Sequence, residues 1–159
     1  NNASSFYPTP VADADDDDWD ALMHSNLRAP FLLSQGLADA LADADGGAIV
    51  NIVDVYADKP LAAHPLYCMA KAGLAMMTKS LARELGPAIR VNGVSPGPIL
   101  WPEQGAEDQD AILDATALKR AGDPDDIANT VAWLALDAPY VTGQILAVDG
   151  GRSLTLAGA

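Results

Sequence analysis

Positive charge is scarce in this sequence. Nine lysines and arginines stand against 22 aspartates and glutamates in 159 residues, which gives a net charge of −13. Such an excess of negative charge repels phosphate backbones and anionic membrane surfaces, which argues against nucleic acid and lipid as partners. Long apolar runs are also absent, since none approaches the roughly 18 residues that a membrane-spanning helix needs. We therefore expect neither a nucleic-acid-binding nor a membrane protein.

Cysteine and histidine are equally rare. Cys68 is the only cysteine and cannot form an internal disulfide, which fits a reducing, cytoplasmic location. We interpret it as a packing residue. His24 and His64 are far apart and in no metal-ligand spacing, so no metal site is expected. Both histidines are interpreted as surface or hydrogen-bonded residues.

What the sequence does contain is an alternation of helical and strand-like segments. The expected elements are a helix over 19–41, a strand over 48–53, a helix over 66–85, a strand over 89–94, a helix over 124–136 and a strand over 144–148. Residues 99–122 are expected to be partly helical. The alternation predicts an α/β fold, a Rossmann-type doubly wound parallel sheet of about three strands and three main helices. Three strands are few for so much helix, as if one side of a larger sheet were missing.

Several helix ends are marked by capping residues. The acidic run 13–20 is interpreted as a loop leading into a helix N-terminus, where carboxylates cap free N–H groups. A cation site is the alternative, but the central glycine of calcium loops is absent. Asp123 and Pro124 similarly predict the start of the last helix, and Gly86 predicts the end of the long middle one.

Tyr67 and Lys71 are the first candidates for chemistry. Their spacing of four residues places both side chains on one face of the predicted helix. An ammonium near a phenol favours the phenolate and lowers the pKa of the tyrosine, which prepares it for proton transfer near neutral pH. The alternative is an ordinary pair of neighbours on a helix surface.

Other polar residues are predicted to gather near this pair. Asp54 follows the strand over 48–53, and Ser95-Pro96-Gly97 follows the next strand. Carboxyl ends of parallel strands lie on one edge of the sheet, where ligands of open α/β folds bind. The opening Asn1-Asn2-Ala3 would join that edge if a strand precedes it.

The order of these motifs along the sequence resembles that of the short-chain dehydrogenase/reductase family, from the first residue to about Gly151. The motifs that carry the resemblance are Asn1-Asn2-Ala3, Asn26, Tyr67-Cys68-Met69-Ala70-Lys71, Val91-Asn92-Gly93-Val94-Ser95-Pro96-Gly97, Asp123-Pro124-Asp125-Asp126-Ile127-Ala128 and Val141-Thr142-Gly143-Gln144 through Val148-Asp149-Gly150-Gly151. The resemblance implies that Tyr67, Lys71, Asp54 and Asn26 are catalytic, Asn26 by ordering a proton-relay water. It implies a nicotinamide cofactor bound by Asn2, Ala3, Ser4, Tyr67, Lys71, Pro96 and Gly97. It also implies a homotetramer, in the full-length form, with the last helix and strand in an interface.

The chain departs from the family in two places. The glycine-rich loop that cradles the dinucleotide pyrophosphate is absent. We therefore expect residues 1–159 to be the C-terminal, catalytic portion of one domain, and expect this portion alone not to bind NADPH. Secondly, Asp54 stands thirteen residues before Tyr67, where the family usually has serine.

Asp54 resembles the pteridine reductase branch of the family, as does the opening Asn2-Ala3-Ser4-Ser5-Phe6. This resemblance implies an NADPH-dependent reduction of dihydropterins, and of dihydrofolate, in the full-length form. Substrate would be bound by Ser4, Phe6, Asp54, Tyr67 and Trp101, with Phe6 stacked on the flat pterin. Phe6 and Trp101 could instead fill core. Two other functions remain open: a carbonyl or hydroxyl oxidoreductase of the same family, and a catalytically silent fragment that only associates with related subunits.

Overall fold

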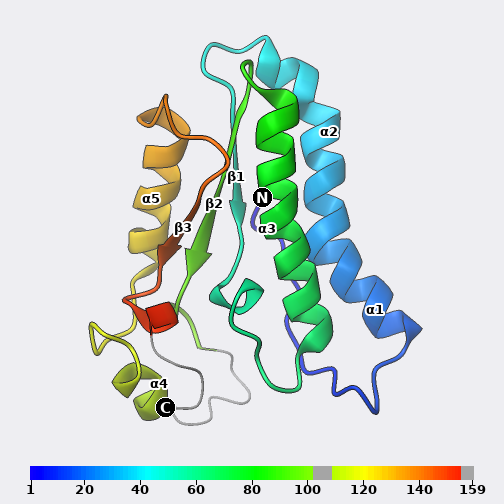
Figure 1. Ribbon diagram of the computed structural model, residues 1–159, viewed down its shortest axis with the longest axis vertical. Coiled ribbons are helices and arrows are strands. Elements are labelled where there is room, and N and C mark those ends of the chain that lie inside the picture. Colours follow the sequence, from blue (N-terminus) through cyan, green and yellow to red (C-terminus); the bar gives the residue numbers. More distant parts are fainter. Residues whose placement is uncertain (102–108, 155–159) are drawn as a thin grey trace.

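The computed structural model describes residues 1–101 and 109–154, and its elements alternate along the chain as predicted (Figure 1). The helices and strands are α1 (Asp16–Met23), a π-helical turn (His24–Arg28), α2 (Ala29–Ala42), β1 (Ala48–Ile52), a 3₁₀ turn (Val55–Ala57), α3 (Pro65–Leu85), β2 (Arg90–Pro96), α4 (Gln109–Asp114), α5 (Pro124–Leu136), β3 (Ile145–Val148) and a 3₁₀ turn (Arg152–Leu154). The predicted α/β class is confirmed. In the segment 99–122, expected to be partly helical, α4 is helical and residues 102–108 lie outside the described residues.

The three strands form one parallel sheet in the order β1-β2-β3. Ile49 lies opposite Val91, and Val94 lies opposite Leu146. Both pairings are parallel, so the carboxyl ends of all three strands lie on the same edge of the sheet. The residues after β1 and after β2 are thereby brought to one edge.

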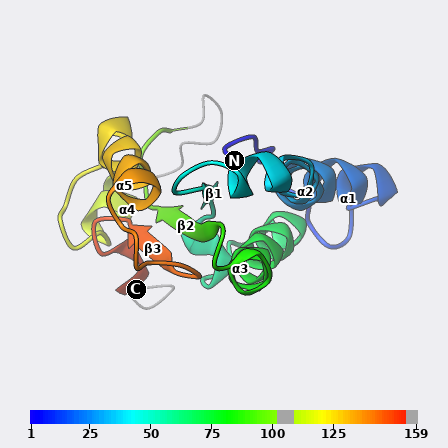
Figure 2. The same ribbon diagram turned by 90° about the horizontal axis from the view of Figure 1, so that it is seen from above.

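Helices cover both faces of this sheet: α3, flanked by α2, lies on one face and α5 on the other (Figure 2). On the α3 face, the buried side chains of Ile49, Val91, Ile89 and Ala82 form an apolar cluster. α3 is the longest helix, with 21 residues. No helix in the described ranges is both long and apolar enough to cross a membrane.

The first predicted helix is real but is not a single regular α-helix. α1 begins at Asp16, three residues before the expected start, because Asp15 accepts a hydrogen bond from the backbone N–H of Asp18. The chain then passes through the π-helical turn His24–Arg28 before α2 begins. Such turns are rare and occur often at functional sites. A hydrophobic pattern does not reveal them.

The apolar positions of α1 and α2 are not all buried. Leu22 of α1 is fully buried, but Leu33 and Leu37 of α2 are 53% and 52% exposed. α2 buries Pro30 and Ser34 instead. The leucines of α2 thus lie mainly on its exposed side.

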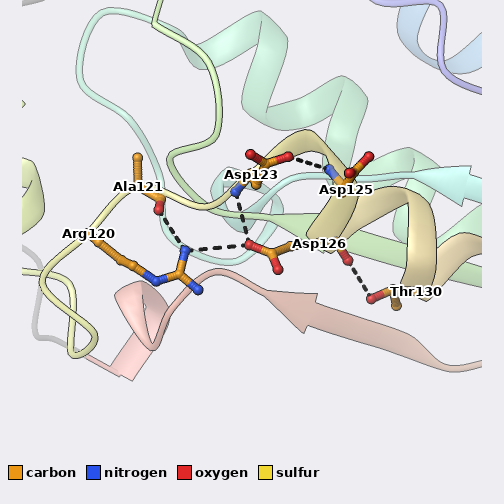
Figure 3. Close-up of polar contacts among 6 residues, drawn as sticks. All are labelled: Arg120, Ala121, Asp123, Asp125, Asp126 and Thr130. Atoms are coloured by element: carbon orange, nitrogen blue, oxygen red, sulfur yellow. Dashed lines mark hydrogen bonds and ion pairs between the residues drawn. The ribbon is translucent and has the colours of Figure 1, made fainter.

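Side-chain hydrogen bonds hold α5 at both ends. At its start, Asp123 and Asp126 form a reciprocal capping box, and Asp126 also pairs with Arg120 at 3.5 Å (Figure 3). At its end, the Arg90 guanidinium donates hydrogen bonds to the carbonyls of Leu134, Ala135 and Ala138 at 2.6–3.0 Å. The carbonyls of Leu134 and Ala135 belong to the last turn of the helix, where acceptors lack intrahelical donors, and Ala138 follows directly after it. Arg90 therefore ties α5 to β2.

Candidate active site

The structure brings Asp54 and Tyr67 into direct contact. The Tyr67 hydroxyl donates a hydrogen bond to Asp54 Oδ2 at 2.6 Å, a short distance typical of a charge-assisted bond. Asp54 Oδ1 accepts from the backbone N–H of Tyr56 at 2.9 Å. Both carboxylate oxygens are therefore engaged, and the carboxylate is held in one orientation at the end of β1.

Lys71 lies one helical turn beyond Tyr67 on α3 and is buried. Its Nζ donates to the carbonyl of Ile52 at 3.0 Å and lies 5.6 Å from the centre of the Tyr67 ring. A lysine ammonium has three N–H donors, and the described contacts show a protein acceptor for one of them. Lys71 is thus anchored to β1 and still has donors to offer a ligand.

The electrostatics of the pair differ from the expectation. Burial, followed by the adjacent Asp54 carboxylate, holds the pKa of the Tyr67 phenol above its ordinary value. Burial also raises the pKa of Asp54, although the hydrogen bonds from Tyr56 and Tyr67 and the charge of Lys71 oppose this rise. The pKa of Lys71 is lowered, again by burial. The predicted lowering of the tyrosine pKa by Lys71 is therefore not found in this arrangement.

Asn26 lies in the π-helical turn and is fully buried. Its amide donates to the backbone carbonyls of Ser5 and Leu22, each at 3.0 Å. Its Oδ1 accepts from the Ser4 hydroxyl at 2.6 Å. The nearby Ser4 hydroxyl also acts to lower the pKa of the Tyr67 phenol, against the larger effect of burial. The structure thus connects Asn26 with the Tyr67 region through a serine hydroxyl.

Three aromatic rings meet beside the Asp54–Tyr67 pair. Phe6 is stacked on His64, with ring centroids 4.7 Å apart and planes at 12°. Phe6 also meets Tyr67 in an edge-on arrangement, with centroids 4.8 Å apart and planes at 77°. That His64 joins this cluster was not predicted, because a stacking contact between residues 58 positions apart has no local pattern in the sequence. Cys68 is half-buried, and its Sγ accepts from the Leu61 N–H at 3.3 Å.

The remaining candidates lie along the edge of the sheet. Asn1 pairs with β1, donating to the Val50 carbonyl and accepting from the Ile52 N–H, which leaves the exposed Asn2 and Ala3 just past the end of β1. Pro96 ends β2. Gly97 lies so close to Asp149 that an added Cβ would be 2.5 Å from the Asp149 Cα, so this approach of the two segments requires glycine. Trp101 is half-buried, and the described contacts do not place it against Tyr67.

A separate cavity of about 620 Å³ lies between α5, β3 and the segment before α5. Arg120 and Asp126 are among its lining residues, and their ion pair is seen in Figure 3. Asp54, Tyr67 and Lys71 do not line it. This cavity is thus distinct from the candidate active site, which lies at the ends of β1 and β2.

A parallel sheet with a Tyr–Lys pair and a carboxylate at its carboxyl edge defines a Rossmann-type α/β protein with polar residues where ligands of such folds bind. Comparison with known proteins agrees. Residues 1–153 match the family profile described as enoyl-(acyl carrier protein) reductase. The chain belongs to the short-chain dehydrogenase/reductase family.

Relatives with different substrates are similarly close. The chain is 41% identical to (2S)-((R)-hydroxy(phenyl)methyl)succinyl-CoA dehydrogenase subunit BbsD of Thauera aromatica over 159 residues, covering 97% of this chain and 64% of that protein. It is 36% identical to pteridine reductase 1 of Leishmania tarentolae over 181 residues, covering 99% and 63%. The chain thus spans less than two thirds of the length of these relatives.

The fold is shared with solved structures of the family. One is a blue fluorescent protein from a metagenomic library in complex with NADPH, which is 39% identical, with a TM-score of 0.86. The match covers 95% of this chain and 62% of that one. Pteridine reductase 1 is one of several differently named relatives of this chain within the family.

Proposed function

We propose that this chain is the C-terminal, catalytic portion of an NADPH-dependent reductase of dihydropterins, dihydrofolate included. The observation that carries the proposal is the hydrogen bond of 2.6 Å between the Tyr67 hydroxyl and Asp54 Oδ2. A carboxylate here can accept hydrogen bonds from the aminopyrimidine edge of a pterin. The similarity to pteridine reductase 1 supports the same substrate class.

The reaction requires a hydride for a ring carbon and a proton for the neighbouring ring nitrogen of the substrate C=N bond. Bound NADPH supplies the hydride. Tyr67 supplies the proton, because its hydroxyl lies at the carboxyl edge of the sheet and its raised pKa keeps it protonated at neutral pH. Asp54 orients the hydroxyl and binds the substrate. Ser4 and Asn26 connect the site to further polar groups.

The residues present fit a nicotinamide cofactor. Lys71 is a buried cation that has N–H donors beyond the one used by Ile52, as a ribose diol requires. Tyr67 lies on the same face of α3, and Pro96, Gly97, Asn2, Ala3 and Ser4 border the same edge of the sheet. We propose these residues as the cofactor contacts of this chain. The preference for NADPH rests on the pteridine reductase likeness, and an NADPH complex of a structural relative is consistent with it.

The test is turnover of dihydrobiopterin against a panel of ketones, with the chain in full-length form. We expect reduction of the pterin. A profile restricted to ketones would refute the proposal and favour a carbonyl reductase of the same family.

Asp54→Ser provides the matched variant, since it installs the side chain that is usual in the family. We expect it to lower kcat/KM for dihydrobiopterin by about a hundredfold or more, as for loss of a group that acts in proton transfer. Wild-type kcat/KM after this change would refute the role assigned to Asp54.

We also propose that the full-length form associates into a homotetramer. Its location would be a reducing cytoplasm, which keeps Cys68 a thiol. The tetramer is supported by apolar surface on the last helix and strand, since Trp133 and Leu136 of α5 and Leu146 of β3 are all exposed. Exposed apolar groups of this kind often mark a protein interface.

A further inference from the structure

The aromatic cluster beside the active site contains a residue that the proposed reaction does not use. The imidazole of His64 covers one face of Phe6 at 4.7 Å and 12°. Phe6 is nevertheless 45% exposed. Phe6 therefore keeps ring surface that the contacts with His64 and Tyr67 leave exposed, enough for another flat group to reach.

The position of His64 is fixed by the loop before α3. Its Nδ1 lies 2.8 Å from the Ala62 carbonyl, which assigns Nδ1–H as the donor. Ala63, between the two, has a φ of +60°, a conformation that non-glycine residues adopt rarely. The Ala63 carbonyl accepts from the Thr9 N–H at 2.7 Å. The same contact ties this loop to the segment that carries Phe6.

We propose that His64 is a positioning residue for the substrate, acting through Phe6. With one face of Phe6 held by the imidazole, the flat substrate stacks on the opposite face and forms a stack of three rings. This inference rests on the proposed function for the identity of the substrate, a pterin. Phe6 meets Tyr67 edge-on, so the orientation of Phe6 also sets where the stacked ring lies relative to the Tyr67 hydroxyl.

The expected effect of removing the His64 ring on KM follows from its stacking contact with Phe6. An offset-stacked aromatic pair contributes about two- to twelvefold to an equilibrium constant beyond the area it buries. Loss of the imidazole should therefore raise KM for a pterin by about that factor. Because His64 does not touch the Asp54–Tyr67 hydrogen bond, kcat should change by less than about twofold.

Proton NMR of the 159-residue chain tests the stack without cofactor or turnover. The sequence has two histidines and two phenylalanines, so His24→Gln and Phe6→Leu assign the relevant ring signals. We expect the His64 ring protons to be shifted upfield by Phe6 and to lose this shift in Phe6→Leu. When biopterin is added, the Phe6 signals should move while those of His64 keep their shift. Return of the His64 signals to unshifted positions would mean that the ligand displaces the imidazole from Phe6. Phe6 signals that do not move at a saturating concentration of biopterin would mean that no stack forms. Either result overturns the inference.

Kinetics of the full-length form separate stacking from a structural role. His64→Leu should raise KM for dihydrobiopterin, and His64→Phe should restore it, because a second aromatic ring replaces the imidazole. His24→Leu is the control and should change neither constant. An unchanged KM in His64→Leu, or failure of His64→Phe to restore it, would overturn the inference while dihydrobiopterin turnover still supports the proposed function. Absence of pterin turnover in the wild type would instead refute the proposed function itself.

Discussion

The contact between Tyr67 and Asp54 can be tested by a double-mutant cycle on the stability of the chain, with no need for cofactor. Tyr67→Phe removes the phenol oxygen that donates to Asp54 Oδ2 at 2.6 Å. Asp54→Ala removes the acceptor, together with the bond from the Tyr56 N–H. The cycle cancels the loss of the Tyr56 bond and isolates the interaction of the two side chains.

The expected coupling is about 1.5–3 kcal/mol at neutral pH, the range of a hydrogen bond to a charged group. Tyr67 is 4% exposed, so solvent replaces the lost partner poorly. Urea unfolding of the wild type, both single variants and the double variant supplies the four free energies. Tyr140→Phe is the control, because this tyrosine is fully exposed and its change should stay within about 0.5 kcal/mol. A coupling below about 0.5 kcal/mol would refute the geometry of the site.

The pH dependence of the Tyr67→Phe variant gives a second check. Burial raises the pKa of Asp54 in the folded chain, so the stability linked to this group is present below its unfolded pKa and is lost as pH rises through the folded pKa. The Tyr67 hydroxyl opposes that loss because it stabilises the ionised carboxylate. Tyr67→Phe should therefore be most destabilising above the pKa of Asp54, and progressively less so below it. Destabilisation that is constant from acid to neutral pH would contradict this explanation.

Two further predictions concern the sheet and the cofactor. Arg90→Met should lower the free energy of unfolding by about 2 kcal/mol, because the carbonyls of Leu134 and Ala135 lose the Arg90 donor and that of Ala138 keeps only the Val141 N–H. Arg83→Met on the exposed side of α3 should have little effect in the same urea experiment. The 159-residue chain alone should show no measurable NADPH binding in a fluorescence titration, because its sequence has no glycine-rich loop for the pyrophosphate; binding at micromolar concentration would contradict this.

Regular elements were predictable where their signals are local. α5 begins at Pro124 as expected because Asp123 and Pro124 carry the start signal within two adjacent residues. α3 ends at Leu85, directly before Gly86. The π-helical turn around Asn26 was not predictable, since the one extra residue in a helical turn shifts the positions that follow by about 100° around the axis but carries no sequence signal of its own. Leu33 and Leu37, which are about half exposed, follow that turn.

The candidate site was predictable in part for a similar reason. The meeting of Asp54 and Tyr67 follows from strand ends that share an edge of the sheet and from a helix that starts beside it. The stack of Phe6 on His64 depends instead on how two loops pack, including the unusual φ of Ala63. The expected effect of Lys71 on Tyr67 failed because spacing along a helix does not report burial, and burial is the largest influence on both residues.

The raised pKa of Tyr67 bears on the protonation state of its phenol in the proposed reaction. A phenol that remains protonated at neutral pH can give a proton to a ring nitrogen as hydride arrives at the adjacent carbon, which is the need of a reductase. Oxidation of an alcohol needs the opposite, a phenolate that accepts a proton. Asp54 disfavours that phenolate through its negative charge and through its hydrogen bond to the phenol. A neutral serine at this position would exert no such charge effect. The carboxylate that would bind the aminopyrimidine edge of a pterin would therefore also keep Tyr67 protonated, while making it a weaker acid, so that substrate choice and the protonation state of Tyr67 would depend on the same side chain.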